Sequence, residues 1–329
     1  MPTPSYRALV VTNLWPSEAD PGYGSFVEAQ MESLKPLGVE FDVLFVNGRE
    51  SLWNYLRGVL QLRHRLRAQH YDLVHAHFGL SGWVARFQFQ IPVVVSFMGD
   101  DVLGRFKRNG RISPVGRVFR ISSYFLSRLV SAVIVKSEKM KATLDLPSAH
   151  VIPNGVDLNL FRPMQRDEAR QSLGLDGGKK FVLFPYSSTT ENKRYDIVQA
   201  AVQNAKREIP QLEIVEVSKV PRPKIPLYMN AADALVIASQ SEGSPNTVKE
   251  AMAVNLPVIT VDVGDAARLI GSTDGCYVVP REAEAMAAKI VEICRRGART
   301  NGRSSMERLS MDKVARQIVQ VYDQVLGRR

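Results

Sequence analysis

The chain contains little cysteine, few tryptophans and no long hydrophobic run. Cys276 and Cys294 are its only cysteines, so the sequence predicts neither a disulfide framework nor a cysteine zinc site. No apolar run approaches the roughly 18 residues typical of a transmembrane helix. Residues 1–7 do not have the layout of a signal peptide, and no repeat or low-complexity segment follows. These absences predict a cytoplasmic protein.

The composition is that of a globular protein with a strong basic balance. The length of 329 residues favours two domains, and the hydrophobic fraction of 45% is sufficient for ordinary cores. The formal net charge is +10. Such a charge favours an anionic partner, which leaves nucleic acid, anionic lipid and phosphorylated ligands as alternatives.

Apolar runs of strand length alternate with helical patterns along most of the chain. Such alternation predicts parallel sheets with helices on both faces, and the pattern restarts near Phe181, as for a second domain. The expected strands are 8–11, 41–46, 72–77, 92–97, 132–135, 181–184, 212–217, 234–238, 257–261 and 276–279. The expected helices include 26–37, 52–69, 226–231, 283–296 and 311–326.

The most informative stretch, residues 239–260, follows the expected strand 234–238. Ser244 is suited to cap a helix there, and Pro245 is suited to its first position. A helix start offers backbone N–H groups and a positive dipole end to an anion such as a diphosphate. Glu242 precedes this helix and Glu250 lies within it, so that one carboxylate can bind sugar hydroxyls and the other a ribose diol. The alternative is a capped helix with two surface glutamates.

The Glu-x7-Glu pattern of Glu242 and Glu250, with the small-residue helix and the Leu-Pro-Val-Ile that follow it, resembles the signature of the family-4 retaining glycosyltransferases. The segment 151–163 resembles the same family. The resemblance implies an α/β protein of GT-B architecture, with two Rossmann-like parallel-sheet domains facing across a cleft. Residues 1–162 together with the last helix, 311–329, would then bind the acceptor, and residues 163–310 the nucleotide sugar.

The resemblance also implies roles for residues of the second domain. Glu250 would hold the donor ribose and Glu242 would contact the donor sugar. The turn that receives the diphosphate would consist of Gly243, Ser244, Pro245, Asn246 and Thr247. Lys193 occupies the position of the family's diphosphate-binding lysine, whereas the usual arginine position falls near the neutral Ser187 or Ser188. Arg194 follows at once and is expected to supply the missing charge, because both cation types bind phosphate.

In the first domain the resemblance implies a cleft or acceptor role for five residues. These residues are Gly22, Gly24, His77, Met98 and Asp101. Met98 is a departure, because the family usually has a histidine at this position. His75 and His77 project to the same side of a strand, which permits a metal pair, but no third ligand is evident. No metal or cofactor is therefore expected.

Between Leu103 and Val130 seven basic residues occur without any acidic residue, and aromatic residues lie among them. Such a stretch is typical of contact with an anionic membrane or a lipid diphosphate. A solvated face over a core helix is the simpler alternative. Nucleic acid is less favoured because no nucleic-acid-binding motif accompanies the stretch.

The expected reaction is transfer of a sugar from a nucleotide-diphosphate-sugar donor to an acceptor hydroxyl, with retention of the anomeric configuration. A retaining hexosyltransferase in cell-surface polysaccharide or glycolipid synthesis, peripheral on the cytoplasmic face of the membrane, fits these features. Two alternatives remain at this point. One is a GT-B epimerase or phosphorylase, and the other is a non-catalytic basic protein that binds membrane or nucleic acid.

Overall fold

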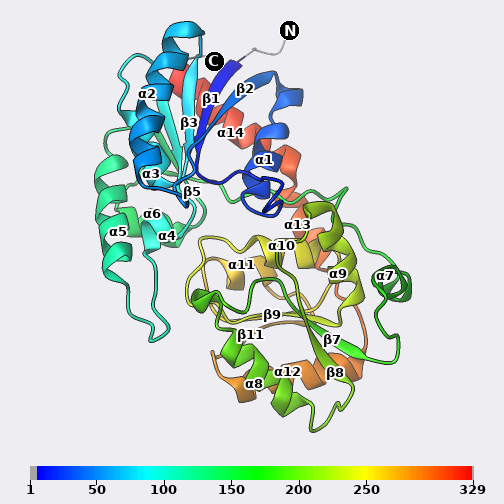
Figure 1. The fold of residues 1–329 in the computed structure, drawn as a ribbon. Helices are drawn as coiled ribbons and strands as arrows, with labels where there is room; N and C mark the ends of the chain where they lie inside the picture. Colours follow the sequence, from blue (N-terminus) through cyan, green and yellow to red (C-terminus); the bar gives the residue numbers. More distant parts are fainter. Residues whose placement is uncertain (1–5, 328–329) are drawn as a thin grey trace. The chain divides into compact units, whose positions relative to one another are not determined.

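The computed structural model describes residues 6–327, which form two compact units, each with its own parallel sheet (Figure 1). The first unit contains the described residues up to Arg105, then Ile112–Gly155, and the chain from Met311 onward. The second unit contains Phe106–Arg111 and Val156–Ser310. Within residues 6–327, no helix combines the length and the apolar content needed to cross a bilayer.

The first unit has a six-stranded parallel sheet in the order β2-β1-β3-β4-β5-β6. Its strands are β1 (Tyr6–Thr12), β2 (Val39–Phe45), β3 (Leu73–His77), β4 (Val93–Ser96), β5 (Ala132–Val135) and β6 (His150–Val151). Alternate residues of a strand point to opposite faces. Leu9 and Val11 accordingly belong to one buried cluster, and Ala8 and Val10 to another. Cores on both faces explain why these strands are continuous apolar runs.

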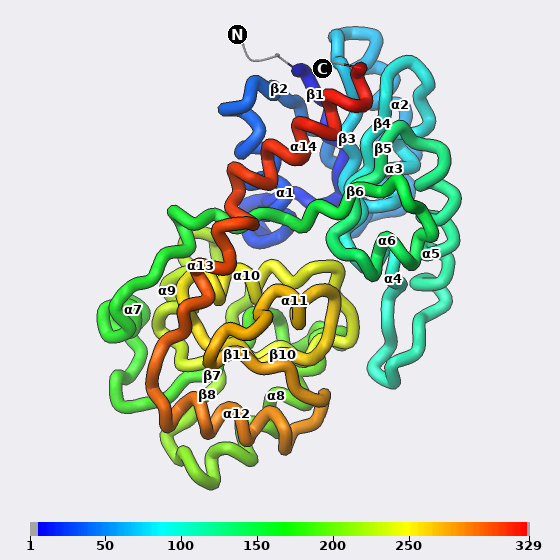
Figure 2. The backbone as a smooth tube through the Cα atoms, turned by 180° about the vertical axis from the view of Figure 1, so that it is seen from behind, coloured from blue at the N-terminus to red at the C-terminus, as the bar shows by residue number. Residues whose placement is uncertain are grey.

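Helices cover both faces of this sheet. They are α1 (Ser25–Glu32), α2 (Trp53–Ala68), α3 (Gly79–Arg86), α4 (Asp100–Leu103), α5 (Pro114–Leu126), α6 (Glu138–Leu144) and α14 (Met311–Leu326), with the 3-10 helix η1 (Lys35–Leu37). Figure 2 shows α14 beside α1, and residues of both helices share one buried cluster with β1. Buried residues of α2, α3 and α5 belong to the cluster on the opposite face. The outer sides of α2, α3 and α5 therefore form one surface layer of the unit.

The second unit has a five-stranded parallel sheet in the order β11-β10-β9-β7-β8. Its strands are β7 (Lys180–Phe184), β8 (Leu212–Glu216), β9 (Ala234–Ile237), β10 (Val258–Thr260) and β11 (Cys276–Val278). The chain proceeds from β7 to β8 on one side and from β9 to β11 on the other. The strand order therefore reverses between β7 and β9, and open parallel sheets bind ligands at the carboxyl ends of strands at such a reversal.

Two layers of helices cover the second sheet, with α8 and α12 on one face (Figure 1). The helices are α7 (Arg166–Leu173), α8 (Tyr195–Ala205), α9 (Ile225–Ala231), α10 (Asn246–Ala253), α11 (Ala266–Ile270), α12 (Ala283–Arg296) and α13 (Gly302–Met306). Three 3-10 turns accompany them, η2 (Glu191–Lys193), η3 (Arg222–Lys224) and η4 (Glu307–Leu309). They enclose a single large apolar cluster.

The ten expected strands are present, and the helices expected at 283–296 and 311–326 have those bounds. The helix expected at 26–37 is wrong in its second half. Helix α1 ends at Glu32, and the following residues form η1, which has Pro36 in its first turn. Proline lacks the N–H that would continue the α-helical ladder. Helices α3, α6 and α7 are too short to produce a long periodic signal and were not expected.

Candidate functional site

The central pair of the second unit joins the loop after β7 to the loop after β9. Lys193 Nζ lies 2.5 Å from Glu242 Oε1, and both side chains are largely buried. These loops leave the carboxyl ends of the two strands between which the sheet order reverses. The sequence predicted each residue for the site separately, 49 positions apart, and the structure brings them together.

The side chain of Tyr186 packs beside this pair. The Lys193 ammonium lies 3.8 Å from the centroid of the Tyr186 ring, and the Tyr186 hydroxyl is 2.9 Å from Thr247 Oγ1. Burial, reinforced by the negative charge of Glu242, raises the pKa of Tyr186 to about 12. Tyr186 is therefore a neutral phenol that links the lysine to the first turn of α10. Sequence reasoning missed this residue, because a tyrosine after a strand has no distinctive pattern.

Arg194 is adjacent to Lys193 in sequence but makes a different ion pair. Its guanidinium binds Asp196 through two nitrogens at 3.0 and 2.8 Å. The hydrogen bond from Arg194, opposed by burial, lowers the pKa of Asp196 to about 2. The backbone of Arg194 is left-handed, with φ of 53°, at the start of α8. This bidentate pair gives Arg194 a structural function at the helix start, and Lys193 alone reaches Glu242.

Glu250 is 8% exposed on α10 and accepts a hydrogen bond from Arg222 Nη1 at 3.1 Å. Arg222 is the first residue of η3, in the connection that follows β8. Its guanidinium also lies 5.3 Å from the centroid of the Phe161 ring. The Arg222 hydrogen bond uses Glu250 Oε1, so Glu250 Oε2 can accept further hydrogen bonds. Sequence reasoning missed Arg222 because the contact joins two different βα connections.

The expected capping by Ser244 is wrong. Helix α10 begins at Asn246 with Pro245 as its N-cap residue, and no side chain caps it. Instead, Ser244 Oγ accepts a hydrogen bond from Lys249 Nζ at 3.2 Å, which folds the turn of Gly243, Ser244 and Pro245 back onto the helix. Asn246 and Thr247 occupy the first turn of α10, which carries no acidic residue. Its N–H groups are suited to an anion.

Lys249 is 1% exposed, and burial, opposed by Asp265 and Glu250, lowers its pKa to about 8. An unfolded chain restores a lysine pKa near 10.5. Between these values the unfolded state binds more protons, so this group's contribution to stability should rise with pH from about 8 to 10.5 and be lost as pH falls through 8. We expect urea unfolding of the wild type to show this rise relative to Lys249→Met. Parallel pH profiles for the two proteins would contradict the assignment.

In the first unit Gly22 and Gly24 lie in the connection from β1 to α1. Gly24 precedes α1 with φ of 74°, and a Cβ atom there would lie 2.2 Å from the carbonyl carbon of Leu14. Only glycine satisfies both constraints. Gly22 is exposed, and its carbonyl accepts a hydrogen bond from the Ser25 hydroxyl at 3.2 Å. The two glycines thus shape a tight loop at the carboxyl end of β1.

Asp101 is buried at the carboxyl end of β4, where its carboxylate accepts hydrogen bonds from three backbone N–H groups. The donors are Met98, Gly99 and Gly79, at 2.9–3.1 Å. Burial, opposed by these bonds, raises the pKa of Asp101 to about 6. Gly79 is the first residue of α3, so Asp101 fastens that helix to the loop after β4. Met98, at the usual histidine position, is partly exposed beside it.

His75 and His77 lie side by side on β3, with ring centroids 4.2 Å apart. His75 contacts the Tyr322 hydroxyl at 2.7 Å and Ser96 Oγ at 2.9 Å. Burial and the nearby Lys136 lower the pKa of His75 to about 3, and burial with His75 and Lys136 lowers that of His77 as well. Both imidazoles are therefore neutral. Among residues 6–327, no three His, Cys, Asp or Glu side chains form a group that could hold a metal ion.

Comparison with known proteins identifies the class to which this fold and site belong. Residues 6–160 match the family Glycosyltransferase Family 4, and residues 191–296 match Glycosyl transferases group 1. The two sheets correspond to those of GT-B glycosyltransferase structures. Both halves of the chain thus match glycosyltransferase families, and the chain is a glycosyltransferase of GT-B fold.

Curated relatives match over most of the chain. The Bacillus subtilis protein TuaC, whose name assigns it to teichuronic acid biosynthesis as a glycosyltransferase, is 26% identical over 86% of this chain and 88% of its own length. The lipopolysaccharide core biosynthesis mannosyltransferase LpsB of Rhizobium meliloti is 29% identical over 62% of this chain and 68% of its own.

Solved structures agree on the fold. Sucrose-phosphate synthase from Thermosynechococcus elongatus superposes with a TM-score of 0.79 at 20% identity, covering 99% of this chain and 100% of the other. Anabaena HepE, solved in complex with UDP and glucose, superposes with a TM-score of 0.70 at 18% identity, covering 97% and 99%. At these identities the likeness establishes the fold and no more.

Proposed function

We propose that this glycosyltransferase transfers a sugar from a nucleotide-diphosphate-sugar donor to an acceptor hydroxyl, with retention of the anomeric configuration. The observation that carries the proposal is the pairing of Lys193 with Glu242 at the point where the second sheet reverses its strand order. Glu250, held by Arg222, lies on the helix that begins beside this pair. The cation and the helix start are suited to a diphosphate, Glu250 is suited to a ribose, and Glu242 is suited to a sugar.

Each group has a distinct task in this reaction. The Lys193 ammonium has three donors, so it can hold Glu242 and phosphate oxygens at once. Negative charge develops on the diphosphate as the glycosidic bond breaks, and fixed positive groups stabilise that charge in the transition state. The Lys193 ammonium and the N–H groups at the start of α10 are these positive groups. Glu242 binds sugar hydroxyls, and Glu250 Oε2 accepts from the ribose diol.

Retention without a protein nucleophile requires the acceptor to approach on the face that the diphosphate leaves. The leaving phosphate oxygen then takes the proton of the acceptor hydroxyl as the new glycosidic bond forms. No metal or cofactor has a task in this scheme. The anomeric configuration of the product, measured by NMR, tests it: an inverted product would contradict the proposal.

The donor is testable by a thermal-shift screen with UDP, GDP, ADP and TDP. UDP is the first candidate, because the HepE structure holds it. A ligand at about 100 times its dissociation constant stabilises a fold by roughly 2.7 kcal/mol. The names of TuaC and LpsB favour an acceptor used in cell-surface polysaccharide or lipopolysaccharide synthesis. Absence of a shift with all four nucleotides would contradict the donor class.

We also propose that residues 103–130 contact an anionic membrane surface on its cytoplasmic side. Helix α5 exposes an apolar row on its outer side, with Val118 at 63% and Phe125 at 56%. Arg117 and Arg120 lie in the same helix, and residues 102–137 contain no acidic side chain. Apolar side chains flanked by cations are typical of helices that lie in a lipid headgroup layer.

Replacing Arg105, Lys107, Arg108 and Arg111 together by serine should release the protein from anionic vesicles. Each cation near an anionic surface contributes about 1 kcal/mol, so the loss is large enough to abolish sedimentation with the vesicles. Wild-type protein should pellet with anionic vesicles, remain in solution with neutral ones, and dissociate near 1 M salt, where the Debye length is about 3 Å. Because Arg108 also pairs with Asp196 at 3.2 Å, UDP binding is measured in parallel to separate any effect at the start of α8 from the loss of vesicle binding. If the wild-type protein does not bind anionic vesicles at low salt, the membrane proposal is wrong.

A further inference from the structure

The exposed apolar side chains of the protein are concentrated in one part of the first unit. Of the 15 large hydrophobic residues that are exposed among residues 6–327, 13 lie in the first unit. Most belong to α2, to the connection that follows α3, and to α5 with Leu129 just after it. Exposed hydrophobic residues scattered singly need no explanation, whereas a contiguous patch marks an interaction site.

The charge of the chain is concentrated in the same segment. Within residues 51–137, leaving out Phe106–Arg111 of the second unit and the buried Lys136, there are 9 arginines and only 3 acidic residues. Helices α2, α3 and α5 contain no acidic residue. A surface that is both apolar and predominantly basic complements an anionic lipid layer.

Helix α2 presents one continuous outer stripe. Trp53, Leu56 and Leu60 are 71%, 59% and 68% exposed, and Arg63 and Arg67 continue the same helical row. These five residues follow one another at intervals of three or four, so they lie on one side of the helix. The stripe is thus apolar in its first half and basic in its second.

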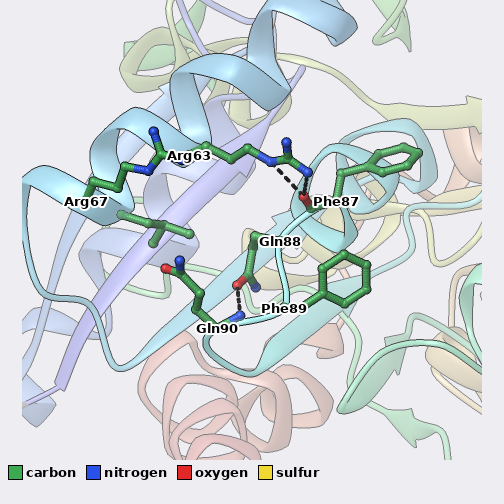
Figure 3. Close-up of a pocket in the computed structure, with 7 residues that line it drawn as sticks. Arg63, Arg67, Phe87, Gln88, Phe89 and Gln90 are labelled. Atoms are coloured by element: carbon green, nitrogen blue, oxygen red, sulfur yellow. Dashed lines mark hydrogen bonds between the residues drawn. The ribbon is translucent and has the colours of Figure 1, made fainter.

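The loop after α3 adds two aromatic side chains beside the basic half of this stripe (Figure 3). Phe87 is 51% exposed and Phe89 is 76% exposed. Arg63 donates two hydrogen bonds to the Phe87 carbonyl oxygen, at 3.1 and 3.0 Å, and so joins α2 to the loop. A pocket of about 280 Å³ lies here, lined by Arg63, Arg67 and residues 87–90.

The exposed phenylalanines are held by a rigid loop. Gln88 is buried, and its amide donates to the Ile91 carbonyl and accepts from the N–H groups of Gln90 and Ile91. The Arg86 guanidinium lies 4.3 Å from the centroid of the Phe89 ring and donates to the Leu129 carbonyl at 2.6 Å. Leu129 follows α5, so one arginine connects this loop to the helix already proposed to contact the membrane. A preorganised loop loses little conformational entropy on binding.

We propose that the pocket between Arg63, Arg67 and residues 87–90 binds the phosphate of an anionic phospholipid, while Phe87, Phe89 and the apolar half of the α2 stripe enter the acyl boundary of the same bilayer. Two guanidinium groups suit a phosphodiester, and exposed aromatic rings suit the layer beneath it. This inference rests on the proposed membrane contact of residues 103–130 and adds a lipid site to it. It does not depend on the sugar-transfer chemistry.

The first experiment measures vesicle affinity. Phe87→Ser combined with Phe89→Ser should weaken binding to phosphatidylglycerol vesicles at least tenfold, because each buried aromatic ring contributes that order of affinity. Arg67→Gln should reduce the preference for phosphatidylglycerol over phosphatidylcholine. Met164→Ser and Arg207→Gln, in the second unit, are the matched controls and should bind as the wild type does. Unchanged binding by both test variants would overturn the site.

The second experiment uses Trp53 as a native depth probe. Vesicles with brominated acyl chains should quench the tryptophan emission of the wild type, and Trp53→Phe should remove most of that quenching, whereas Trp15→Phe should keep it. Equal quenching in the Trp53→Phe variant would overturn insertion of the stripe. A wild-type dimer that the Phe87/Phe89 variant converts to a monomer, with vesicle binding intact, would show that a second copy occupies this face and would also overturn the proposal.

UDP thermal shifts of the same variants separate this inference from the proposed function. If UDP does not raise the melting temperature of the wild type, UDP is not the donor nucleotide. The vesicle experiments would still test the lipid site. Conversely, loss of vesicle binding with an unchanged UDP shift would confine the effect to the outer face of the first unit.

Discussion

Replacing Lys193 by alanine is expected to lower kcat by roughly 100- to 1000-fold, the range found when one preorganised group that stabilises transition-state charge is removed. Lys193 is the cation that reaches Glu242, and Tyr186 holds its ammonium from the other side. Its charge acts mainly on the leaving diphosphate, so the loss should fall on kcat more than on KM. Steady-state kinetics with the donor found in the nucleotide screen provides the measurement.

Arg194→Ala is the matched control for this prediction. Arg194 has the same charge and the adjacent position, but its guanidinium is bound bidentately to Asp196. We expect at most a several-fold change in kcat and a modest loss of stability at the start of α8. If Arg194→Ala is the more damaging variant, Arg194 supplies the phosphate contact and the role given to Lys193 is wrong.

Glu250→Ala should weaken nucleotide binding by roughly 10- to 150-fold, because a charge-assisted hydrogen bond contributes about 1.5–3 kcal/mol. The change removes the acceptor for the ribose and leaves the Arg222 guanidinium without its carboxylate. Isothermal titration calorimetry with the nucleoside diphosphate measures the effect. Glu213→Ala, in the edge strand β8 of the same sheet, is the control, because Glu213 forms an exposed ion pair with Lys179.

Arg222 allows a stricter test of the same site. If Arg222 acts by positioning Glu250, then Arg222→Ala should weaken binding in the wild-type background and have little further effect in the Glu250→Ala background. Such non-additivity is expected of residues in direct contact. Fully additive losses would indicate that Arg222 contacts the nucleotide independently, and unchanged affinity in Glu250→Ala would remove Glu250 from the site.

The local patterns of the sequence were sufficient for the strands and the long helices. Runs such as residues 132–135 are apolar at every position because both faces of a parallel sheet are covered, and the period of α14 identifies its buried side. The resemblance also implied site roles for Glu242, Glu250 and Lys193. Apolar runs, helical periodicity and short motifs each depend on residues that are near one another in the chain, so they can be recognised in a single sequence.

Only the tertiary structure decided which of these groups meet. The Glu242–Lys193 and Glu250–Arg222 pairs each join two segments that follow different strands, and strand order, not sequence distance, brings such segments together. The sequence also predicted that Ser244 would cap α10. In the structure the Ser244 hydroxyl instead accepts a hydrogen bond from the buried Lys249 ammonium, and no side chain caps the helix. The sequence showed a basic stretch at 103–130, whereas the packing of α2, α3 and α5 on one face of the first sheet made its α5 part belong to a larger surface of the first unit. Burial of the inner side of each helix determines which residues remain outside, and that burial exists only once the sheet has formed.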